Sequence, residues 1–132
     1  MIDGFKKVQL MSGTAFVSIT SNGLNFNKNV VLKMDRPKFI SIYLNDDEKL
    51  LAIQRDEEQT GDNVAFVREK TNIANGVRVH NRELERMVEH MMQWDLESHN
   101  YRIDGFYDDS AQAMMFDLKQ ARIFGKENYP KK

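Results

Sequence analysis

The 132-residue chain contains no cysteine and only three histidines, and each shortage removes a class of chemistry. Without cysteine there is no disulfide framework and no Cys-based zinc site. The histidines, at 80, 90 and 99, have no i, i+4 spacing for a metal site on a helix, so we expect no metal and no cofactor. Nucleophilic and general-base catalysis have few candidate groups, and there is no Gly-rich phosphate loop. The composition therefore favours a protein that is not an enzyme.

Long apolar runs are also missing, since none approaches the roughly 18 residues of a membrane-spanning helix. The first seven residues lack the apolar core of a signal peptide. We therefore expect a cytoplasmic protein with no membrane partner. The hydrophobic share of 41% and the charged share of 30% are those of an ordinary globular domain.

The net charge is only −1, but it is spread unevenly along the chain. Residues 1–55 carry a net +3, residues 56–100 a net −5 and residues 101–132 a net +1. A mildly basic first part can face phosphate. An ordinary mixed surface would give similar totals, so the charge alone does not decide between partners.

A pattern of turn, short strand, helix and hairpin occurs twice. Residues 22–34 align with residues 75–87, and a hairpin follows each stretch, over 40–53 and 103–116. The offset between the copies is 53 residues in the turn and helix and 63 in the hairpins, which indicates one extension in or just after the second helix. An internal duplication explains this pattern, and a coincidence of common β–α patterns is the alternative.

Local signals predict the elements of each copy. Asn27 and Asn81 are suited to cap two helices, expected over 28–34 and 82–96. Alternating apolar residues predict the strands 14–20, 24–26, 38–44, 49–54, 64–68, 77–79, 101–107 and 113–118. We expect a mainly β, α+β domain of two tandem β-β-α-β-β units. Its parts are repeat one (14–55), a connector (56–63), repeat two (64–118) and a flexible tail (125–132).

Residues 22–53 resemble the SpoVT/AbrB-like, swapped-hairpin family of bacterial DNA-binding regulators. The resemblance rests on the Gly23 turn, the short strand, the helix to Met34 and the hairpin with an acidic tip at 45–48. Two such units in one chain are similar to the tandem arrangement of the MraZ proteins. The resemblance implies that the units interlock by exchanging hairpins, which gives one pseudo-two-fold barrel. It also implies a transcriptional regulator that contacts DNA from the Asn-Gly turn and helix start of each repeat.

The chain departs from the family pattern at two kinds of position. Asn27 and His80 stand where the family usually has proline after the short strand. Family members often carry arginines in the turn and helix, whereas here only Lys33 and Arg86, one position further along, keep a positive charge. The resemblance therefore supports the fold better than it supports DNA binding.

Cations near the two Asn-Gly turns are the candidate DNA contacts. Arg82 and Arg86 are four residues apart on one helix face, and Arg78 lies between two inward valines, so it should face solvent. Such a row can contact phosphates or guanine edges, and pairing with neighbouring glutamates explains it equally well. The full set is Lys28, Lys33, Arg78, Arg82 and Arg86.

The alternative function is a protein-interaction module, such as an antitoxin-like or phage-accessory subunit. It would bind a partner through the acidic middle third and the methionine-rich second helix. Methionine fills gaps in cores and is also common on adaptable binding surfaces. Leu84 and Met87 follow the spacing of a core-facing stripe, whereas Met92 and Trp94 are expected at the surface as partner contacts.

Overall fold

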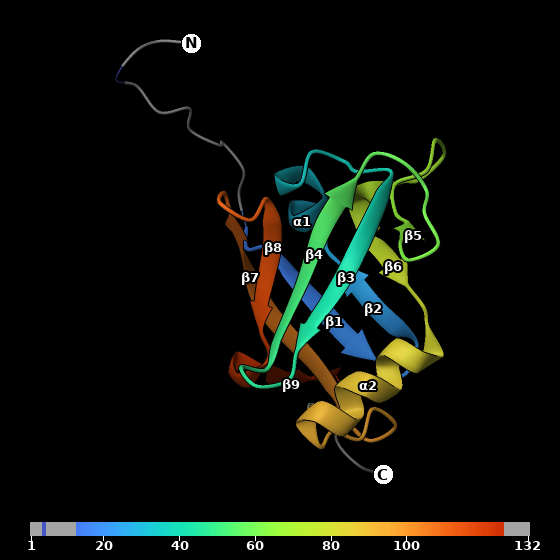
Figure 1. The fold of residues 1–132 in the computed structure, drawn as a ribbon. Coiled ribbons are helices and arrows are strands. Elements are labelled where there is room, and N and C mark those ends of the chain that lie inside the picture. The colour runs from blue at the N-terminus through green and yellow to red at the C-terminus, as the bar shows by residue number, and fades with distance from the viewer. Residues whose placement is uncertain (1–3, 5–12, 126–132) are drawn as a thin grey trace.

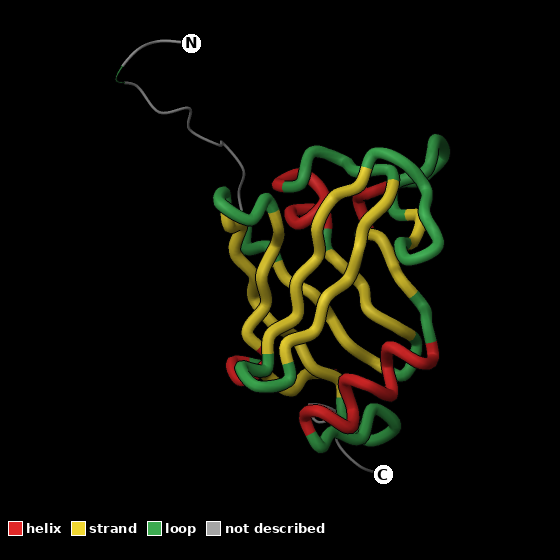
Figure 2. Tube along the Cα trace, in the orientation of Figure 1, coloured by secondary structure: helices red, strands yellow, loops and turns green. Residues whose placement is uncertain are grey.

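The computed structural model describes Gly4 and residues 13–125. Over these residues the chain is mostly β, with nine strands, two α-helices and two short 3-10 helices (Figures 1 and 2). The strands are β1 (Phe16–Thr20), β2 (Gly23–Phe26), β3 (Phe39–Asn45), β4 (Leu50–Asp56), β5 (Val64–Ala65), β6 (Val77–Val79), β7 (Asn100–Asp108), β8 (Ala113–Asp117) and β9 (Arg122–Phe124). The helices are α1 (Lys28–Lys33), η1 (Ile73–Asn75), α2 (Arg82–Met92) and η2 (Leu118–Gln120).

The strands form one antiparallel sheet that curls into a nearly closed barrel (Figure 2). The order around the barrel is β5-β3-β4-β8-β7-β1-β2-β6, and β9 pairs with β7 outside this sequence. Within the described residues, β5 and β6 do not pair with each other, so the barrel stays open between them. Helices α1 and α2 lie at opposite ends of the barrel (Figure 1). No helix in the described part of the chain is long and apolar enough to span a membrane.

Side chains from both halves of the sequence fill one core. The ring of Phe26 in β2 lies 5.7 Å from that of Phe66 and 5.8 Å from that of Phe116 in β8. Full burial of a large apolar side chain stabilises the fold by about 1.5–3 kcal/mol. The other large side chains with under 2% exposure include Val17, Ile19, Leu24, Ile40, Leu51, Ile53, Ile103, Met114 and Leu118.

Asparagine side chains cap both α-helices, as the sequence predicts. Asn27 accepts from the Val30 amide at 3.2 Å, and Asn81 accepts from the Leu84 amide at 2.9 Å. The second helix ends at Met92 and not at residue 96, so this boundary was predicted wrongly. The helix stops there because Gln93 takes a left-handed conformation, with a φ of 58°.

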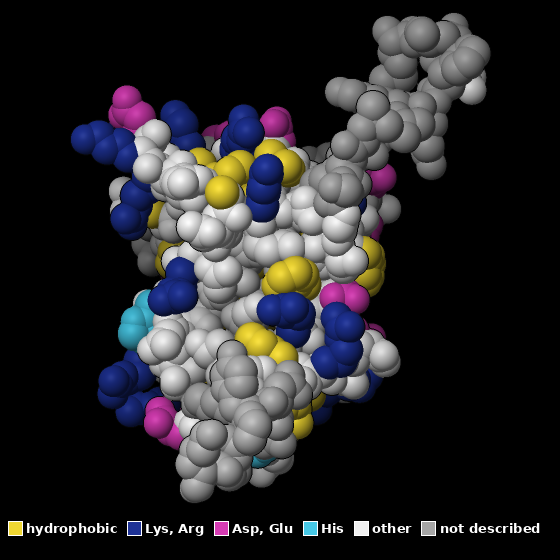
Figure 3. Space-filling view, turned by 180° about the vertical axis from the view of Figure 1, so that it is seen from behind, with side chains coloured by type: hydrophobic (Ala, Val, Ile, Leu, Met, Phe, Trp, Pro, Cys, Tyr) yellow, Lys and Arg dark blue, Asp and Glu magenta, His cyan; other side chains and the backbone are white. Residues whose placement is uncertain are grey.

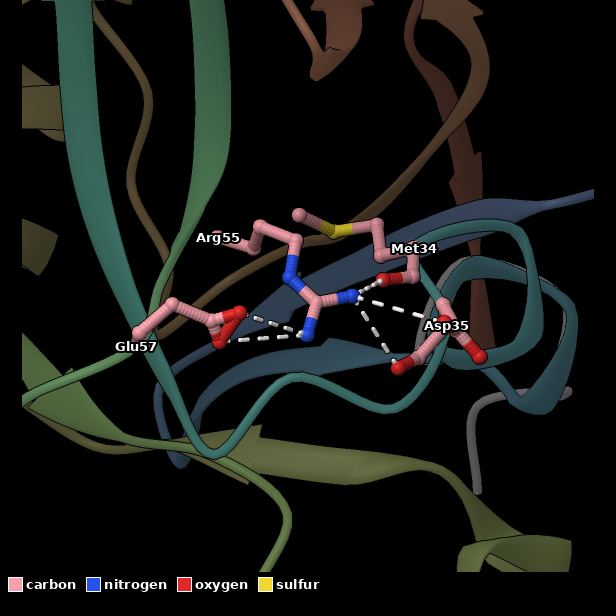
Figure 4. A network of polar contacts seen from close by, with 4 residues as sticks. All are labelled: Met34, Asp35, Arg55 and Glu57. Carbon is pink, nitrogen blue, oxygen red and sulfur yellow. Dashed lines mark hydrogen bonds and ion pairs between the residues drawn. The ribbon is translucent and has the colours of Figure 1, made fainter.

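An arginine from the first hairpin holds the C-terminal end of α1 (Figure 4). Arg55 of β4 donates from Nη1 to the carbonyl oxygens of Met34 at 3.0 Å and Asp35 at 3.2 Å. Its Nη2 donates to the carboxylate of Glu57 at 3.2 Å. A cation is favourable at this position because the last carbonyls of a helix have no intrahelical partner and carry partial negative charge. Arg55 therefore joins the helix to the hairpin.

Both predicted hairpins are confirmed, as β3–β4 and β7–β8. The strand predicted over 64–68 is shorter, because only Val64 and Ala65 are paired in β5 and a turn closed by Arg68 and Thr71 follows. Strand β9 was not predicted. Of the predicted flexible tail, only Gly125 lies within the described residues.

Candidate binding surfaces

The five predicted DNA contacts do not form one patch. Lys28 and Lys33 belong to α1 and Arg82 and Arg86 to α2, at opposite ends of the barrel (Figure 1). Lys33 is half-buried and the other four are exposed. Arg78 is the member that lies on a strand, β6. A single flat ligand surface would therefore meet only part of the set.

Arg82 and Arg86 share a surface hollow of about 210 Å³ with acidic side chains. One of these, Glu85, is 7% exposed, and its Oε2 lies 3.4 Å from Nε2 of His80. Carboxylates beside guanidinium groups reduce the positive potential that a phosphate would meet. The acidic lining residues are Glu85, Glu89 and Glu97.

Arg78 lies at the middle of the ladder between β2 and β6. It is exposed, as predicted, while Val77 and Val79 on either side are buried. Asn25 stands opposite it on β2. The pair presents a guanidinium and an amide on the outer face of the barrel. The Asn25 amide donates from Nδ2 to the carbonyl oxygen of Asn75 at 3.4 Å, and the guanidinium can donate hydrogen bonds to a ligand.

Positive side chains are scattered over the face of the barrel opposite to that of Figure 1, with uncharged surface between them (Figure 3). Two arginines near β1 and β7 are also engaged within the protein. The Arg102 guanidinium lies 4.2 Å from the ring centre of Phe16 and 4.6 Å from that of Phe124. Arg122 pairs with Asp104 at 2.8 Å. The cations of this region therefore do not form the continuous stripe that nucleic-acid surfaces commonly have.

Met92 and Trp94, the predicted partner contacts, are half-buried and pack against the core. The Trp94 ring stacks on Tyr101, with centroids 3.8 Å apart and planes 6° from parallel. Met87, which was expected to face the core, is 52% exposed. The largest exposed apolar side chain of α2 is therefore Met87.

An apolar cleft of about 510 Å³ opens beside Met87, where β5 and β6 fail to pair. Ile42 and Leu44 of β3 line one wall, and Leu84 and Met87 of α2 line the other. The remaining lining residues are Ile40, Asp62, Val64, Val79, Asn81 and Glu83. Sequence reasoning did not assign this site. The sequence signal for this cleft was the long segment that joins the two short strands of the second copy. In the first copy a two-residue turn joins the corresponding strands.

An acidic hollow adjoins the cleft on the other face of β3. Ser41, Ile42 and Tyr43 contribute from the strand, and the connector contributes the acids. Asp56 accepts from Oγ of Ser41 at 2.5 Å and from Nδ2 of Asn63 at 2.9 Å. These hydrogen bonds favour the ionised form and lower the pKa of Asp56 below its ordinary value. The acidic lining residues are Asp56, Glu57, Glu58 and Asp62.

Among the described residues, no three His, Asp or Glu side chains converge as metal ligands would. No family model, curated protein or solved structure matches the chain. A proposal about function therefore depends on the geometry of the cations, the cleft and the acidic hollow.

Proposed function

We propose that the chain is a DNA-binding transcriptional regulator built from two copies of one unit that interlock by exchanging hairpins. The sheet order supports the interlocking. Taken as a ring, this order is unchanged when β1 is exchanged with β5, β2 with β6, β3 with β7 and β4 with β8. The exchange also converts the β1–β7 pair into the β5–β3 pair, and both pairs are present. In each, the first strand of one copy pairs with the hairpin of the other.

The register of the β2–β6 ladder supports the same exchange. Asn25 faces Arg78, with Leu24 opposite Val79 and Phe26 opposite Val77. Residues 53 positions apart correspond between the copies, so each flanking pair maps onto the other and the central pair maps onto itself. A slip of one residue would break this relation and turn every side chain to the opposite face.

The β4–β8 ladder obeys the same rule with the hairpin offset of 63 residues. Ala52 faces Met115 at its centre, and the flanking pairs are Leu51–Phe116 and Ile53–Met114. Both offsets come from the sequence alone, and the two ladders are independent. Their agreement supports a pseudo-two-fold axis through the Asn25–Arg78 and Ala52–Met115 pairs.

The exposed position of Arg78 beside this axis is the observation that carries the proposal of DNA binding. Lys33 and Arg86 are also equivalent under the exchange, because they are 53 positions apart. The two strands of a DNA duplex are related by two-fold axes, so a pseudo-two-fold protein can present matching cations to both backbones. The resemblance to swapped-hairpin regulators leads to the same function.

Fluorescence anisotropy with a pool of random-sequence DNA duplexes tests this function. Affinity should fall steeply with salt, because each phosphate contact releases counterions. Arg78→Ala should reduce the slope of log affinity against log salt by about 0.9. Arg68→Ala removes the same charge from another exposed residue and should leave the slope unchanged. Absence of binding at low salt, or equal effects of the two substitutions, would contradict the proposal.

A protein partner is the second candidate function. The observation that favours it is the apolar cleft beside Met87, because open apolar surface next to a strand edge is typical of interaction sites. Purification of the tagged chain from its own cells tests this function. The expected result is a partner retained at high salt, where contacts to DNA are lost. Met92→Ala and Trp94→Ala, compared with Met87→Ala, would show whether the partner contacts the end of α2 and the residues after it or the part of α2 beside the cleft.

A further inference from the structure

One difference between the two copies creates the cleft. In the first copy Val17 of β1 pairs with Phe26 of β2. Val79 is the equivalent of Phe26, 53 positions later, and Val64 is the equivalent of Val17, because the two pair with hairpin residues that are 63 positions apart. Val64 and Val79 both line the cleft and are not paired with each other in the described structure. The first two strands are joined by a two-residue turn, whereas residues 66–76 separate the second two. The second copy therefore lacks one closure of the barrel.

The missing closure leaves apolar surface uncovered on the second helix. Val31 of α1 and Met34, its C-cap residue, are 0% and 2% exposed. Their equivalents 53 positions later are Leu84 and Met87 of α2, of which Leu84 is half-buried and Met87 is 52% exposed. Two apolar side chains that belong to the core in one copy thus line an open cleft in the other.

The same opening exposes the edge of β3. One edge of this strand pairs with β4 along its whole length, but the other pairs with β5 only at Phe39 and Ile40. The carbonyl of Lys38 accepts a hydrogen bond from the chain on the β5 side. Peptide groups of alternate residues in a strand point to the same edge. The N–H and C=O groups of Ile42 and Leu44 therefore face this edge, where no other strand of the described residues pairs with them.

The two faces of this free edge have different chemistry. The inward face, at Ile42 and Leu44, borders the apolar cleft. The outward face, at Ser41 and Tyr43, borders the acidic hollow, which also reaches Ile42 at the edge itself. Across the two hollows the charged lining residues described are all acidic, namely Asp56, Glu57, Glu58, Asp62 and Glu83. A ligand strand laid along β3 would meet apolar surface on one side and carboxylates on the other.

We propose that the edge of β3 binds an extended peptide of a partner protein in which apolar residues alternate with lysine or arginine. The peptide adds as a strand, and its backbone pairs with Ile42 and Leu44. Its apolar side chains enter the cleft between β3 and α2, while its cations lie over the acidic hollow. A second copy of the chain is a poorer occupant, because it would bring the same carboxylates against each other. The site rests on the protein-partner function and is independent of DNA binding.

A fluorescein-labelled peptide of alternating lysine and valine tests the site, with a peptide of the same composition but all valines adjacent as the control. In anisotropy titrations the alternating peptide should bind at least tenfold more tightly than the control. On binding, the amides of Ile42 and Leu44 should exchange more slowly with deuterium, which electrostatic attraction alone would not cause. Equal binding of the two peptides, or binding without this protection, would overturn the proposal.

Matched substitutions locate the peptide on the protein. Met87→Lys and Glu83→Lys should each weaken binding about tenfold, since one blocks the cleft and the other reverses a rim charge. Asp109→Lys makes the same charge change as Glu83→Lys at an exposed hairpin tip and should have little effect. Equal weakening by these two reversals would show general attraction to an acidic protein and would overturn the site.

Two further outcomes separate this site from other modes of assembly. A stable dimer in sedimentation equilibrium that Met87→Lys dissociates would assign the edge to a second copy and would overturn the proposal. A natural partner whose binding is lost with Met92→Lys but kept with Met87→Lys would also overturn it. That last result would leave the protein-partner function itself standing.

Discussion

Gly23 and Gly76 make the same backbone contact from opposite halves of the chain. A Cβ at Gly23 would lie 2.7 Å from the carbonyl oxygen of Val79, and a Cβ at Gly76 would press on the carbonyl oxygen of Phe26. Val79 and Phe26 end β6 and β2, the two short strands that pair with each other. The repeated Asn-Gly therefore marks the two points where the backbone of one short strand meets the start of the other.

Alanine at either glycine should destabilise the protein. Both residues have positive φ, 123° and 81°, where a Cβ is strained, and each added Cβ would displace a paired strand. We expect Gly23→Ala and Gly76→Ala each to lower the free energy of unfolding by about 2 kcal/mol or more. Urea denaturation followed by circular dichroism measures this.

The control for these substitutions is Gly61→Ala. Gly61 has no heavy atom within 4 Å of an added Cβ and no positive φ. Its replacement should change stability by less than about 1 kcal/mol, with stabilisation as the expected direction. If Gly76→Ala proved as harmless as Gly61→Ala, the close approach of the two short strands would not matter for folding.

The helix starts and the hairpins were predictable because their signals are local. Asn27 and Asn81 cap the helices with their own side chains, and the capped amides are three residues away in each case. In the first hairpin, alternation along β3 predicts that Ile40, Ile42 and Leu44 share a face, as they do in the cleft. Such features depend on a few neighbouring residues, so a short stretch of sequence contains the whole signal.

The exposure of Met87 was not predictable in this way. Met34, the C-cap residue of α1, and Met87, which lies within α2, align in the sequence, yet one is 2% and the other 52% exposed. The difference arises from distant segments, since it depends on whether the two strands that precede each helix close against each other. A helical pattern shows which side chains share a face, but it does not show whether another element covers that face.

The proposed interlocking makes a direct prediction about the two halves of the chain. Residues 1–58 and 59–132, expressed separately, should each be unfolded. In the whole chain, strand pairs and the contacts of Phe26 with Phe66 and Phe116 cross between the halves, so separation exposes the core of each. Circular dichroism and amide-proton dispersion in NMR spectra provide the measurement. Two stable, folded monomeric halves would show that the units do not depend on each other.

Arg55 should contribute measurably to stability through the end of α1. Arg55→Ala leaves the carbonyls of Met34 and Asp35 without this donor, and we expect a loss of about 1–2 kcal/mol in the free energy of unfolding. Arg55→Lys keeps the charge, but a single ammonium group cannot donate to the helix carbonyls and to the carboxylate on the other side at once, as the guanidinium does. It should therefore recover only part of the loss. Arg68→Ala is the control at an exposed arginine. A similar small effect of Arg55→Ala and Arg68→Ala would contradict the role of Arg55 in joining helix and hairpin.

Asp56 should link stability to pH in the acidic range. Hydrogen bonds from Ser41 and Asn63 lower the pKa of Asp56 in the folded protein below the value of about 3.9 expected in the unfolded chain. The unfolded state therefore binds this proton first as the pH falls. The stabilisation from Asp56 is fully present above about pH 4 and is lost as the pH falls through the lower folded pKa.

Asp56→Asn should reduce stability at neutral pH, and it should make stability fall less steeply in the acidic range than in the wild type. Urea midpoints at a series of pH values measure both effects, with Asp109→Asn at an exposed tip as the control. Parallel curves for the wild type and Asp56→Asn would mean that the hydrogen bonds at Asp56 do not couple folding to its ionisation.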